Sequence, residues 1–268
     1  ISGSITSTAS FGHYLGDGSG LTNLPSQAAF PFTGDAQITG SLIISGSFIP
    51  RGPGVSHISN ISIGQNAGPD LTSTGQENVI IGSNAGSKLD GEDYTVLIGS
   101  SAGRYLQFSN SGQSNVIIGG LAGRNLKGTL GVGADAIDGN VFIGFYAGYG
   151  AVSGNTDGVK YNIGIGQKSL EDINGGQGNT TIGYEAGKSI SSGDGNIIIG
   201  SGSLGSDNPS NQLRIGNGNS FTLISGSLSD GGILIQGQVS ASSYIGDGSA
   251  LTNLPQNFTA AGISGSFT

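Results

Sequence analysis

Short apolar triplets, each closed by glycine, recur along the middle of the chain. The VII of residues 79–81 and the III of residues 197–199 are two examples, and Asn precedes most of the triplets. The closing glycines lie most often 17 residues apart, at positions 64, 82, 99, 119, 144, 166, 183, 200 and 216. With the Ala-Gly pair that usually follows, the unit reads N-x-x-I-G-x-x-A-G before a loop of variable length. A period of this kind is typical of stacked repeats.

The triplets predict short β-strands, and no helical periodicity of useful length is present. We therefore expect an all-β fold, a repetitive parallel β-roll or β-solenoid that occupies residues 60–219. Roughly eight coils, each with a short pair of strands, would rise on the order of 40 Å at the spacing of neighbouring strands.

Side-chain alternation divides each triplet between two faces. The first and third residues are apolar in almost every repeat, so we expect Val79, Ile81, Ile118, Ile143 and Ile199 to point into the coil. The middle residue would then point outward, as an apolar stripe that marks a contact surface. A coil this small and glycine-rich is expected to be poorly stable alone, and threefold association would bury the stripe. The sequence thus predicts a homotrimer whose interface contains Ile80, Leu97, Ile117, Phe142 and Ile198.

The polar and small residues that recur in the repeat unit also have physical roles. Asn opens seven of the eight triplets, and stacked Asn amides can hydrogen-bond from coil to coil. The glycine after the triplet permits a sharp corner that a side chain would block.

A second repeat flanks the coils. GDGSGLTNLP at residues 16–25 returns as GDGSALTNLP at residues 246–255. We interpret residues 1–59 and 220–268 as β-strand joint modules, the second of which begins a further repeat. Since the chain starts at Ile1 and contains no Met, it is expected to be an internal piece or a processed chain. Around a trimer axis, four leucines of the decapeptides would hold three chains in register: Leu21, Leu24, Leu251 and Leu254.

Composition narrows the class of protein. Among 268 residues, 53 are Gly and only 10% are charged, and Cys is absent, which excludes disulfides and thiol chemistry. The net charge of −8 disfavours nucleic-acid binding. No run approaches the roughly 20 apolar residues that span a bilayer, so membrane insertion is not expected.

The N-x-x-I-G-x-x-A-G coils resemble the left-handed parallel β-roll head of trimeric autotransporter adhesins. Together with the GDGSGLTNLP decapeptides and the ISGS strings at residues 1, 44, 224 and 263, they are still more similar to tail-fibre and other structural fibre proteins of marine and cyanobacterial phages. The resemblance implies a segment of a trimeric viral tail fibre, located on the virion or an extracellular surface. Other virion or fibre proteins would be its partners, and it could contribute to host attachment.

Catalytic, cofactor and metal sites are not expected. GDGSG lacks the Lys of a phosphate-binding loop, and single histidines such as His57 offer a metal only through symmetry copies. Carboxylates of the kind that a tailspike depolymerase uses gather at Asp90, Glu92 and Asp93, and at Glu171 and Asp172. Both groups fall in predicted loops, where solvated charge is the usual interpretation.

Aromatic residues gather where the coil spacing lengthens, between Gly99 and Gly166. Aromatic faces stack on sugar rings, so a cell-surface glycan is a candidate ligand. The plainer interpretation is that these rings cover coil edges or the trimer surface. The possible glycan contacts are Tyr105, Phe108, Phe145, Tyr146 and Tyr149.

Three functions remain open. The chain is a structural fibre segment, with or without a share in host attachment; or it is a bacterial trimeric adhesin head; or it is a polysaccharide depolymerase of the tailspike type.

Overall fold

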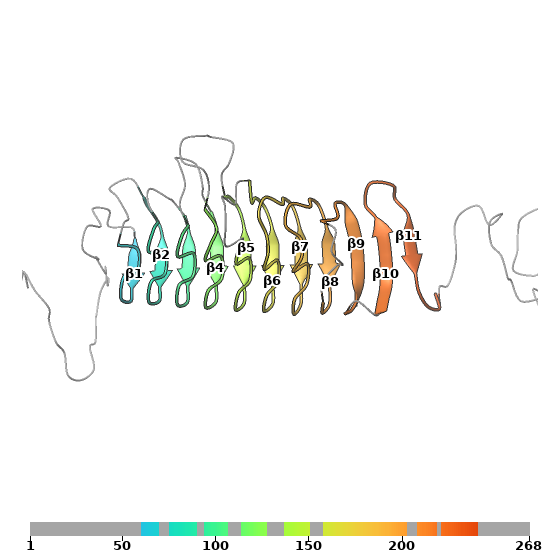
Figure 1. Ribbon diagram of the computed structural model, residues 1–268, viewed down its shortest axis with the longest axis horizontal. Helices are drawn as coiled ribbons and strands as arrows, with labels where there is room; N and C mark the ends of the chain where they lie inside the picture. The colour runs from blue at the N-terminus through green and yellow to red at the C-terminus, as the bar shows by residue number, and fades with distance from the viewer. Residues whose placement is uncertain are drawn as a thin grey trace, which may run out of the picture. The chain divides into compact units, whose positions relative to one another are not determined.

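The computed structural model describes residues 60–69, 75–89, 94–106, 114–127, 137–150, 158–202, 208–218 and 221–240. Within these residues the secondary structure is all-β, and the strands form a single sheet in the order of the sequence (Figure 1). The strands are β1 Ile61–Ile63, β2 Val79–Ile81, β3 Val96–Ile98, β4 Val116–Ile118, β5 Val141–Ile143, β6 Ile163–Ile165, β7 Thr180–Ile182, β8 Ile197–Ile199, β9 Gln212–Asn217, β10 Phe221–Ser227 and β11 Ile233–Ile235.

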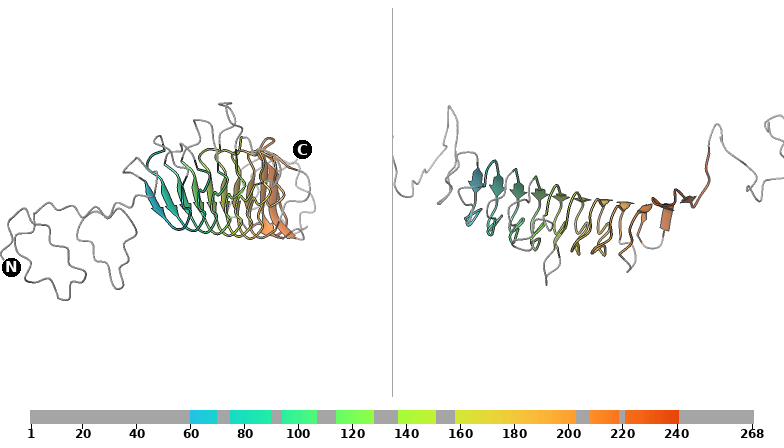
Figure 2. Two further views of the ribbon diagram at one scale, coloured as in Figure 1. Left: turned by 60° about the vertical axis from the view of Figure 1, so that its left-hand side comes forward. Right: turned by 90° about the horizontal axis from the view of Figure 1, so that it is seen from above.

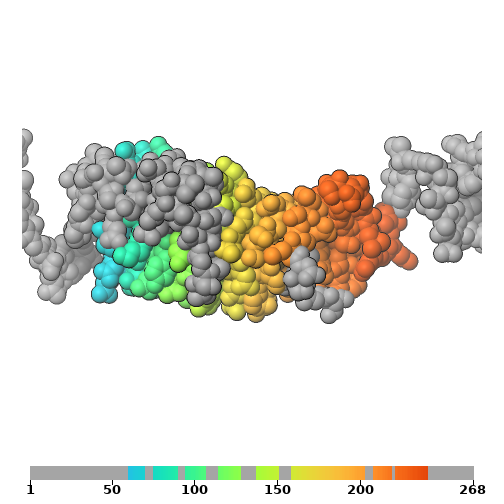
Figure 3. All heavy atoms as spheres, turned by 45° about the horizontal axis from the view of Figure 1, so that its top comes forward, coloured from blue at the N-terminus to red at the C-terminus, as the bar shows by residue number. Residues whose placement is uncertain are grey.

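The strands β1 to β9 are parallel, and each lies one coil after the previous one. The register is unbroken from coil to coil: Ile61 pairs with Val79, and Ile63 pairs with Ile81. Seen from above, the strands follow one another along the axis of the stack (Figure 2), and the coils pack directly on one another in the order of the chain (Figure 3). The predicted parallel β-solenoid is therefore confirmed.

One strand per described coil replaces the predicted pair. The chain leaves each strand through a glycine and enters two tight turns, which form what we call the turn wall: residues 64–69, 82–89, 99–106, 119–127, 144–150, 166–173 and 183–190. Asn66 and Gly68 of the first coil have φ angles of 54° and 53°, which strand geometry does not allow. The turn wall is nevertheless tied to the next coil, because the Gly68 N–H donates to the Ala85 carbonyl at 3.0 Å.

The middle residue of each strand points into the coil, which is the opposite of the orientation predicted from the sequence. Ile80, Leu97, Ile117 and Phe142 are fully buried within the single chain, and Ile198 is 4% exposed. These five side chains therefore form the core of the chain, and their assignment to a trimer interface is wrong. The first and third residues point outward instead, including all five that were expected inside: Val79, Ile81, Ile118, Ile143 and Ile199.

The turn wall explains why only the middle residue points inward, because the wall fills most of the small interior. Two of its positions are buried in most coils: the Ala of the Ala-Gly pair, as at Ala102, and an apolar residue near the end of the wall, as at Leu106. Space then remains for one large side chain per strand. The buried residues that repeat this arrangement are Ala67, Ala85, Ala122, Ala147, Ala186, Leu89, Leu126, Ile173 and Ile190.

The core row ends in polar residues at both ends of the stack. Ser62 is the middle residue of β1, and its hydroxyl donates to the Ala67 carbonyl. Arg214 takes the same register position in β9, where its Nε donates to the Thr222 hydroxyl at 2.9 Å. The apolar interior is therefore confined to the coils between them.

The repeat glycines are required by close contact between coils. Gly82, Gly99 and Gly119 have φ angles of 132–137°. A Cβ atom on Gly82 would lie 2.4 Å from the carbonyl oxygen of Gly99, and the same clash repeats along the stack. This confirms the expectation that a side chain cannot occupy the corner.

Asparagines form a buried hydrogen-bonded ladder beside the strands, as predicted. The Oδ1 atom of Asn162 accepts the backbone N–H of Asn179 at 2.9 Å and the side-chain Nδ2 at 3.0 Å. Asn179 Oδ1 receives the same pair of bonds from Asn196, at 3.0 and 2.8 Å. Each Nδ2 atom also donates to a loop carbonyl, for example that of Gly176 from Asn162 at 2.7 Å.

The solenoid continues into an antiparallel meander formed by β9, β10 and β11. Successive residues of β11 point to opposite faces of the sheet, yet Ile233, Leu234 and Ile235 are 65%, 57% and 42% exposed. Phe221 of β10 is 56% exposed. The described residues of one chain therefore cover neither face of β11.

The decapeptides, with Leu21, Leu24, Leu251 and Leu254, lie outside the described residues, as does Phe108. The boundaries of the joint modules at 59/60 and 219/220 remain sequence predictions.

Candidate functional site: an arginine and tyrosine cluster on the turn wall

Backbone pairing along the turn wall places one residue from each coil in a single row. The Lys88 N–H donates to the Arg104 carbonyl at 3.1 Å, and the Tyr105 N–H donates to the Arg124 carbonyl at 2.9 Å. The Asn125 N–H continues the series to the Tyr149 carbonyl at 2.8 Å. Arg104, Arg124 and Tyr149 thus occupy neighbouring positions along the axis.

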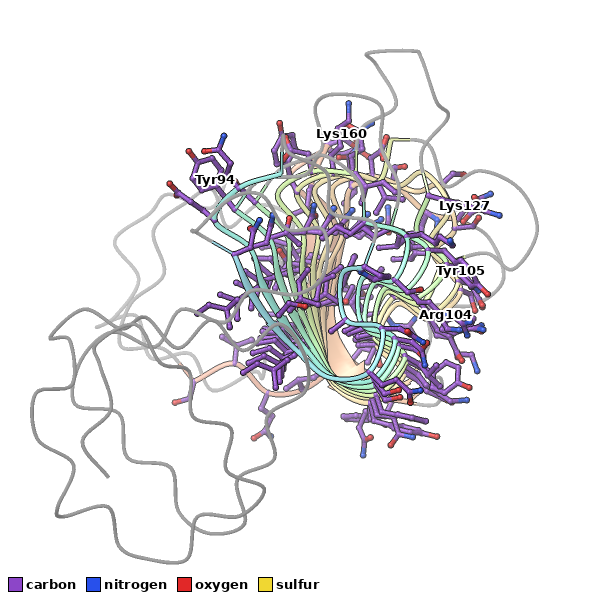
Figure 4. The ribbon with its side chains drawn as sticks, turned by 90° about the vertical axis from the view of Figure 1, so that its left-hand side faces the viewer. Tyr94, Arg104, Tyr105, Lys127 and Lys160 are labelled. Carbon is purple, nitrogen blue, oxygen red and sulfur yellow. The ribbon has the colours of Figure 1, made fainter. Side chains whose placement is uncertain are left out.

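This row lies away from the strands. In the view along the axis, the strands run down one side of the coil, whereas Arg104 and Tyr105 project from the other side (Figure 4). Tyr94 and Lys160 lie at a different part of the perimeter.

Two arginines share one tyrosine ring. The guanidinium carbons of Arg104 and Arg124 each lie 5.2 Å from the centroid of the Tyr105 ring. Arg124 also lies 5.9 Å from the Tyr149 ring, and its Nη1 donates to the Tyr149 hydroxyl at 2.8 Å. Cation–π contacts of this length are attractive, so Tyr105 holds both side chains in place.

Further aromatic rings extend the cluster within the fifth coil. Tyr146 and Tyr149 have centroids 4.7 Å apart with an angle of 36° between their planes. The ring centroids of Phe145 and Tyr146 are 4.5 Å apart with an angle of 76° between the planes, and Phe145 is 48% exposed. We call the set Arg104, Tyr105, Arg124, Tyr146 and Tyr149 the Arg–Tyr cluster.

The cluster carries positive charge on a chain that is negative as a whole. Residues 94–134 contain Arg104, Arg124 and Lys127 but neither Asp nor Glu, although the net charge of the chain is −8. No carboxylate among the described residues pairs with Arg104 or Arg124. Their Nε atoms are shielded from solvent and have no hydrogen-bond partner within the described part of the chain.

Most of the aromatic residues proposed from the sequence are therefore brought together. Tyr105, Tyr146 and Tyr149 belong to one cluster with Phe145 at its edge, while Phe108 lies outside the described residues. The sequence interpretation missed Arg104 and Arg124. Both directly follow an Ala-Gly pair, at equivalent positions of neighbouring repeats, and this signal would have placed them in one row.

Beyond Tyr149 the row changes to ion pairs. Glu171 lies 3.1 Å from the Nζ of Lys188 and 3.7 Å from that of Lys168. The hydrogen bond with Glu171 raises the pKa of Lys188. Burial raises the pKa of Asp172, and the neighbouring charge of Glu171 raises it further.

These contacts bear on the carboxylates that the sequence offered for hydrolysis. Glu171 is paired with both Lys168 and Lys188, so its carboxylate belongs to a network of ion pairs on the turn wall. Asp90, Glu92 and Asp93 lie outside the described residues.

Among the described residues, no three His, Asp or Glu side chains come together as a metal site would require. The same part of the chain contains no helix of the length and apolarity needed to cross a membrane. Models of protein families, curated proteins and solved structures were each compared with the chain, and none matches it.

Proposed function

We propose that the chain is a non-enzymatic structural segment of a homotrimeric fibre, of the kind found in bacteriophage tails. Its turn wall contributes to attachment at the host surface, and other fibre or virion proteins continue the fibre at either end. The assignment to a phage fibre is supported by the similarity of the decapeptides, the ISGS strings and the coils to those of phage fibre proteins.

The proposed assembly is based on an apolar face that extends along strands β1 to β9 of the sheet. Two rows of outward-pointing side chains, which we call the sheet face, follow β1 to β9, and Thr180 is their single polar member. Exposed isoleucines of the rows, such as Ile63 at 46% and Ile165 at 36%, are well above the exposure of core residues. The first row is Ile61, Val79, Val96, Val116, Val141, Ile163, Thr180, Ile197 and Leu213, and the second is Ile63, Ile81, Ile98, Ile118, Ile143, Ile165, Ile182, Ile199 and Ile215.

Contiguous apolar surface of this extent is unusual for a free-standing chain and marks an interaction surface. The side chains of the sheet face repeat at the strand spacing of about 4.8 Å. Another copy of the chain, aligned in parallel, repeats with the same period and matches the face at every coil. A second copy is thus the partner that covers the rows over their full length.

Three copies form a closed arrangement in which each sheet face points to a common axis. The meander supports the same conclusion, because Ile233 and Leu234 on opposite faces of β11 are both exposed, and the described residues of one chain supply no cover for them. The turn wall, on the other side of the coil, stays open in such an assembly (Figure 4).

Native mass spectrometry of the wild-type chain tests the assembly, with a trimer as the expected mass. Ile118→Asp places three carboxylates close to the axis and is expected to give monomer or aggregate. Its circular dichroism in the monomer should remain that of β-structure, because Ile118 points away from the core. Asn66→Asp adds the same charge on the exposed turn wall and should leave the trimer intact.

A wild-type monomer or dimer would overturn the threefold assembly. An Ile118→Asp variant that stays trimeric with unchanged melting would show that the sheet face is not the interface. Release of reducing ends from capsular polysaccharide by the wild-type protein would contradict the non-enzymatic part of the proposal.

A further inference from the structure

We propose that the Arg–Tyr cluster binds an acidic saccharide, with Arg104 and Arg124 holding a carboxylate or sulfate group and the tyrosines contacting the sugar rings. This inference deepens the proposed function, since it rests on the turn wall as the attachment surface and specifies the class of ligand.

The two arginines of the cluster give it two positive charges without a described negative charge to pair with them. The guanidinium carbons of Arg104 and Arg124 are each 5.2 Å from the centroid of the Tyr105 ring, so the two cations can be no more than twice that distance apart. Like charges in a partly desolvated setting repel one another, and no described carboxylate offsets this repulsion. An anionic group that reaches both guanidinium groups would be attracted by both.

The hydrogen-bonding capacity of the arginines is also incompletely used. Among the described residues, neither Nε atom has an acceptor, and of the remaining guanidinium nitrogens only Nη1 of Arg124 donates to a side chain, the Tyr149 hydroxyl. A guanidinium presents its donors in a planar fork that matches a carboxylate or sulfate. The cation–π contacts with Tyr105 orient this fork before any ligand arrives, which lowers the entropy lost on binding.

The aromatic part of the cluster favours a sugar over a small inorganic anion. Tyr105, Tyr146 and Tyr149 are each only half-buried, so part of every ring remains at the surface. Rings of this kind offer an apolar face and a polar hydroxyl, which suit the mixed surface of a sugar.

The row also has the length of a chain-like ligand. Arg104, Arg124 and Tyr149 come from successive coils, which places the first and last roughly 10 Å apart along the axis at the strand spacing. A ligand that contacts all three must extend along the fibre, and a linear polysaccharide does so. Three copies of the site in a trimer would add avidity for a repeating polymer.

The experiment measures binding of the full chain to immobilised polygalacturonate, which carries carboxylates, to dextran sulfate and to neutral dextran. The wild type is expected to bind at least one of the anionic polymers and not neutral dextran. Arg104→Gln and Arg124→Gln should each weaken binding by about 10-fold or more, the loss expected for a charge-assisted hydrogen bond. Arg124→Lys should recover only part, because lysine keeps the charge but not the fork.

Lys168→Gln is the matched control, since it removes one positive charge from the same wall two coils later, and it should bind as the wild type does. Binding to polygalacturonate alone assigns a carboxylate, and binding to dextran sulfate alone assigns a sulfate. Equal binding by the Arg→Gln variants and the wild type would overturn the inference, as would no binding to either anionic polymer.

Native mass spectrometry on the same samples separates this inference from the assembly. A trimer that binds neither anionic polymer leaves the structural fibre standing and removes the anion site. A monomer that binds an anionic polymer through Arg104 and Arg124 keeps the site and removes the fibre assembly.

Discussion

The phenyl ring of Phe142 in β5 lies against the backbone of Gly164, its register partner in β6. A Cβ atom on Gly164 would be 3.0 Å from Cδ1 of Phe142. Leu170 borders the same space, with its Cδ1 3.5 Å from that position. The largest core side chain is therefore accommodated by the absence of a side chain in the next coil, and the two positions depend on each other.

We expect Gly164→Val to lower the free energy of unfolding by about 1–3 kcal/mol, because it overpacks the space that the Phe142 ring fills. Phe142→Leu replaces the ring with a smaller side chain, so the double variant should recover some of the loss. Denaturant unfolding of the two single variants and the double variant measures the coupling. Additive losses would show that the two positions do not share this space.

The repeat architecture could be predicted from the sequence because each of its signals is local. The Asn ladder, the glycine corners and the parallel strands all follow from the period and from the residue types. The number of strands per coil was wrong, since the sequence did not reveal that residues such as Asn66, with φ 54°, turn the second wall out of strand geometry.

The inside and outside of the strand were exchanged for a physical reason. Both sets of positions are apolar, so hydrophobicity alone cannot tell which face is buried. The middle row includes Ser62, Gly164 and Thr181, and these exceptions made the other row look like the core. The Asn that opens the strand held the missing signal: Asn78 is buried, and Ile80, two residues later, must share its face.

The sequence pointed to the tyrosines of the site directly, and the repeat also gave the shared row of the arginines, but it did not give their contact with one ring. Tyr105 and Tyr149 drew attention by their type, whereas Arg104 and Arg124 gain significance only when two coils place them on one ring.

The Asn ladder should be sensitive at its interior members. Asn162→Ala removes the Oδ1 that accepts two bonds from Asn179, and the Nδ2 that serves the Gly176 carbonyl. Leaving buried polar groups without partners costs about 1–3 kcal/mol each, so a loss of at least 2 kcal/mol in stability is expected. Denaturant unfolding measures it, with Gln167→Ala on the exposed wall as a control that should change little. A loss below 1 kcal/mol for Asn162→Ala would contradict a structural role for the ladder.

Two glycines with positive φ should respond very differently to alanine. At Gly144, with φ 139°, a Cβ would lie 2.5 Å from the carbonyl oxygen of Gly166, so Gly144→Ala should prevent close stacking of the coils and strongly lower the melting temperature. At Gly178, with φ 64°, nothing lies within 4 Å of that atom. Gly178→Ala should therefore cost only the backbone strain of about 1–2 kcal/mol. Similar losses for both variants would show that contact between coils is not what selects glycine.

Because the middle residue of each strand points inward, substitutions at two neighbouring residues of β4 should have different effects. Ile117 is fully buried within the chain, so Ile117→Ala should destabilise the coil by about 2–5 kcal/mol whatever the oligomeric state. Ile118 points outward, so Ile118→Ala should have its main effect on association and a smaller effect on unfolding of the monomer. Unfolding and sedimentation at several protein concentrations separate the two effects. Concentration-dependent stability in Ile117→Ala but not in Ile118→Ala would restore the original assignment.

Asp172 should make the stability of the solenoid depend on pH. Burial and the charge of Glu171 raise its pKa above the ordinary value of 3.8, and Lys188 and Lys168 only partly oppose this. A carboxyl whose pKa is raised by folding contributes stability below its ordinary pKa and loses that contribution as the pH rises through the pKa of the folded protein. The ionised Asp172 therefore destabilises the folded chain at neutral pH.

Asp172→Asn, which stays neutral, should raise the melting temperature at pH 7 by a small amount, equivalent to less than about 1 kcal/mol because the side chain is exposed. The gain should vanish below pH 3.8. Asp230→Asn, in the exposed turn before β11, removes the same charge and serves as the control, which should give no such gain. A gain for Asp172→Asn that is equal at every pH would contradict the role of ionisation.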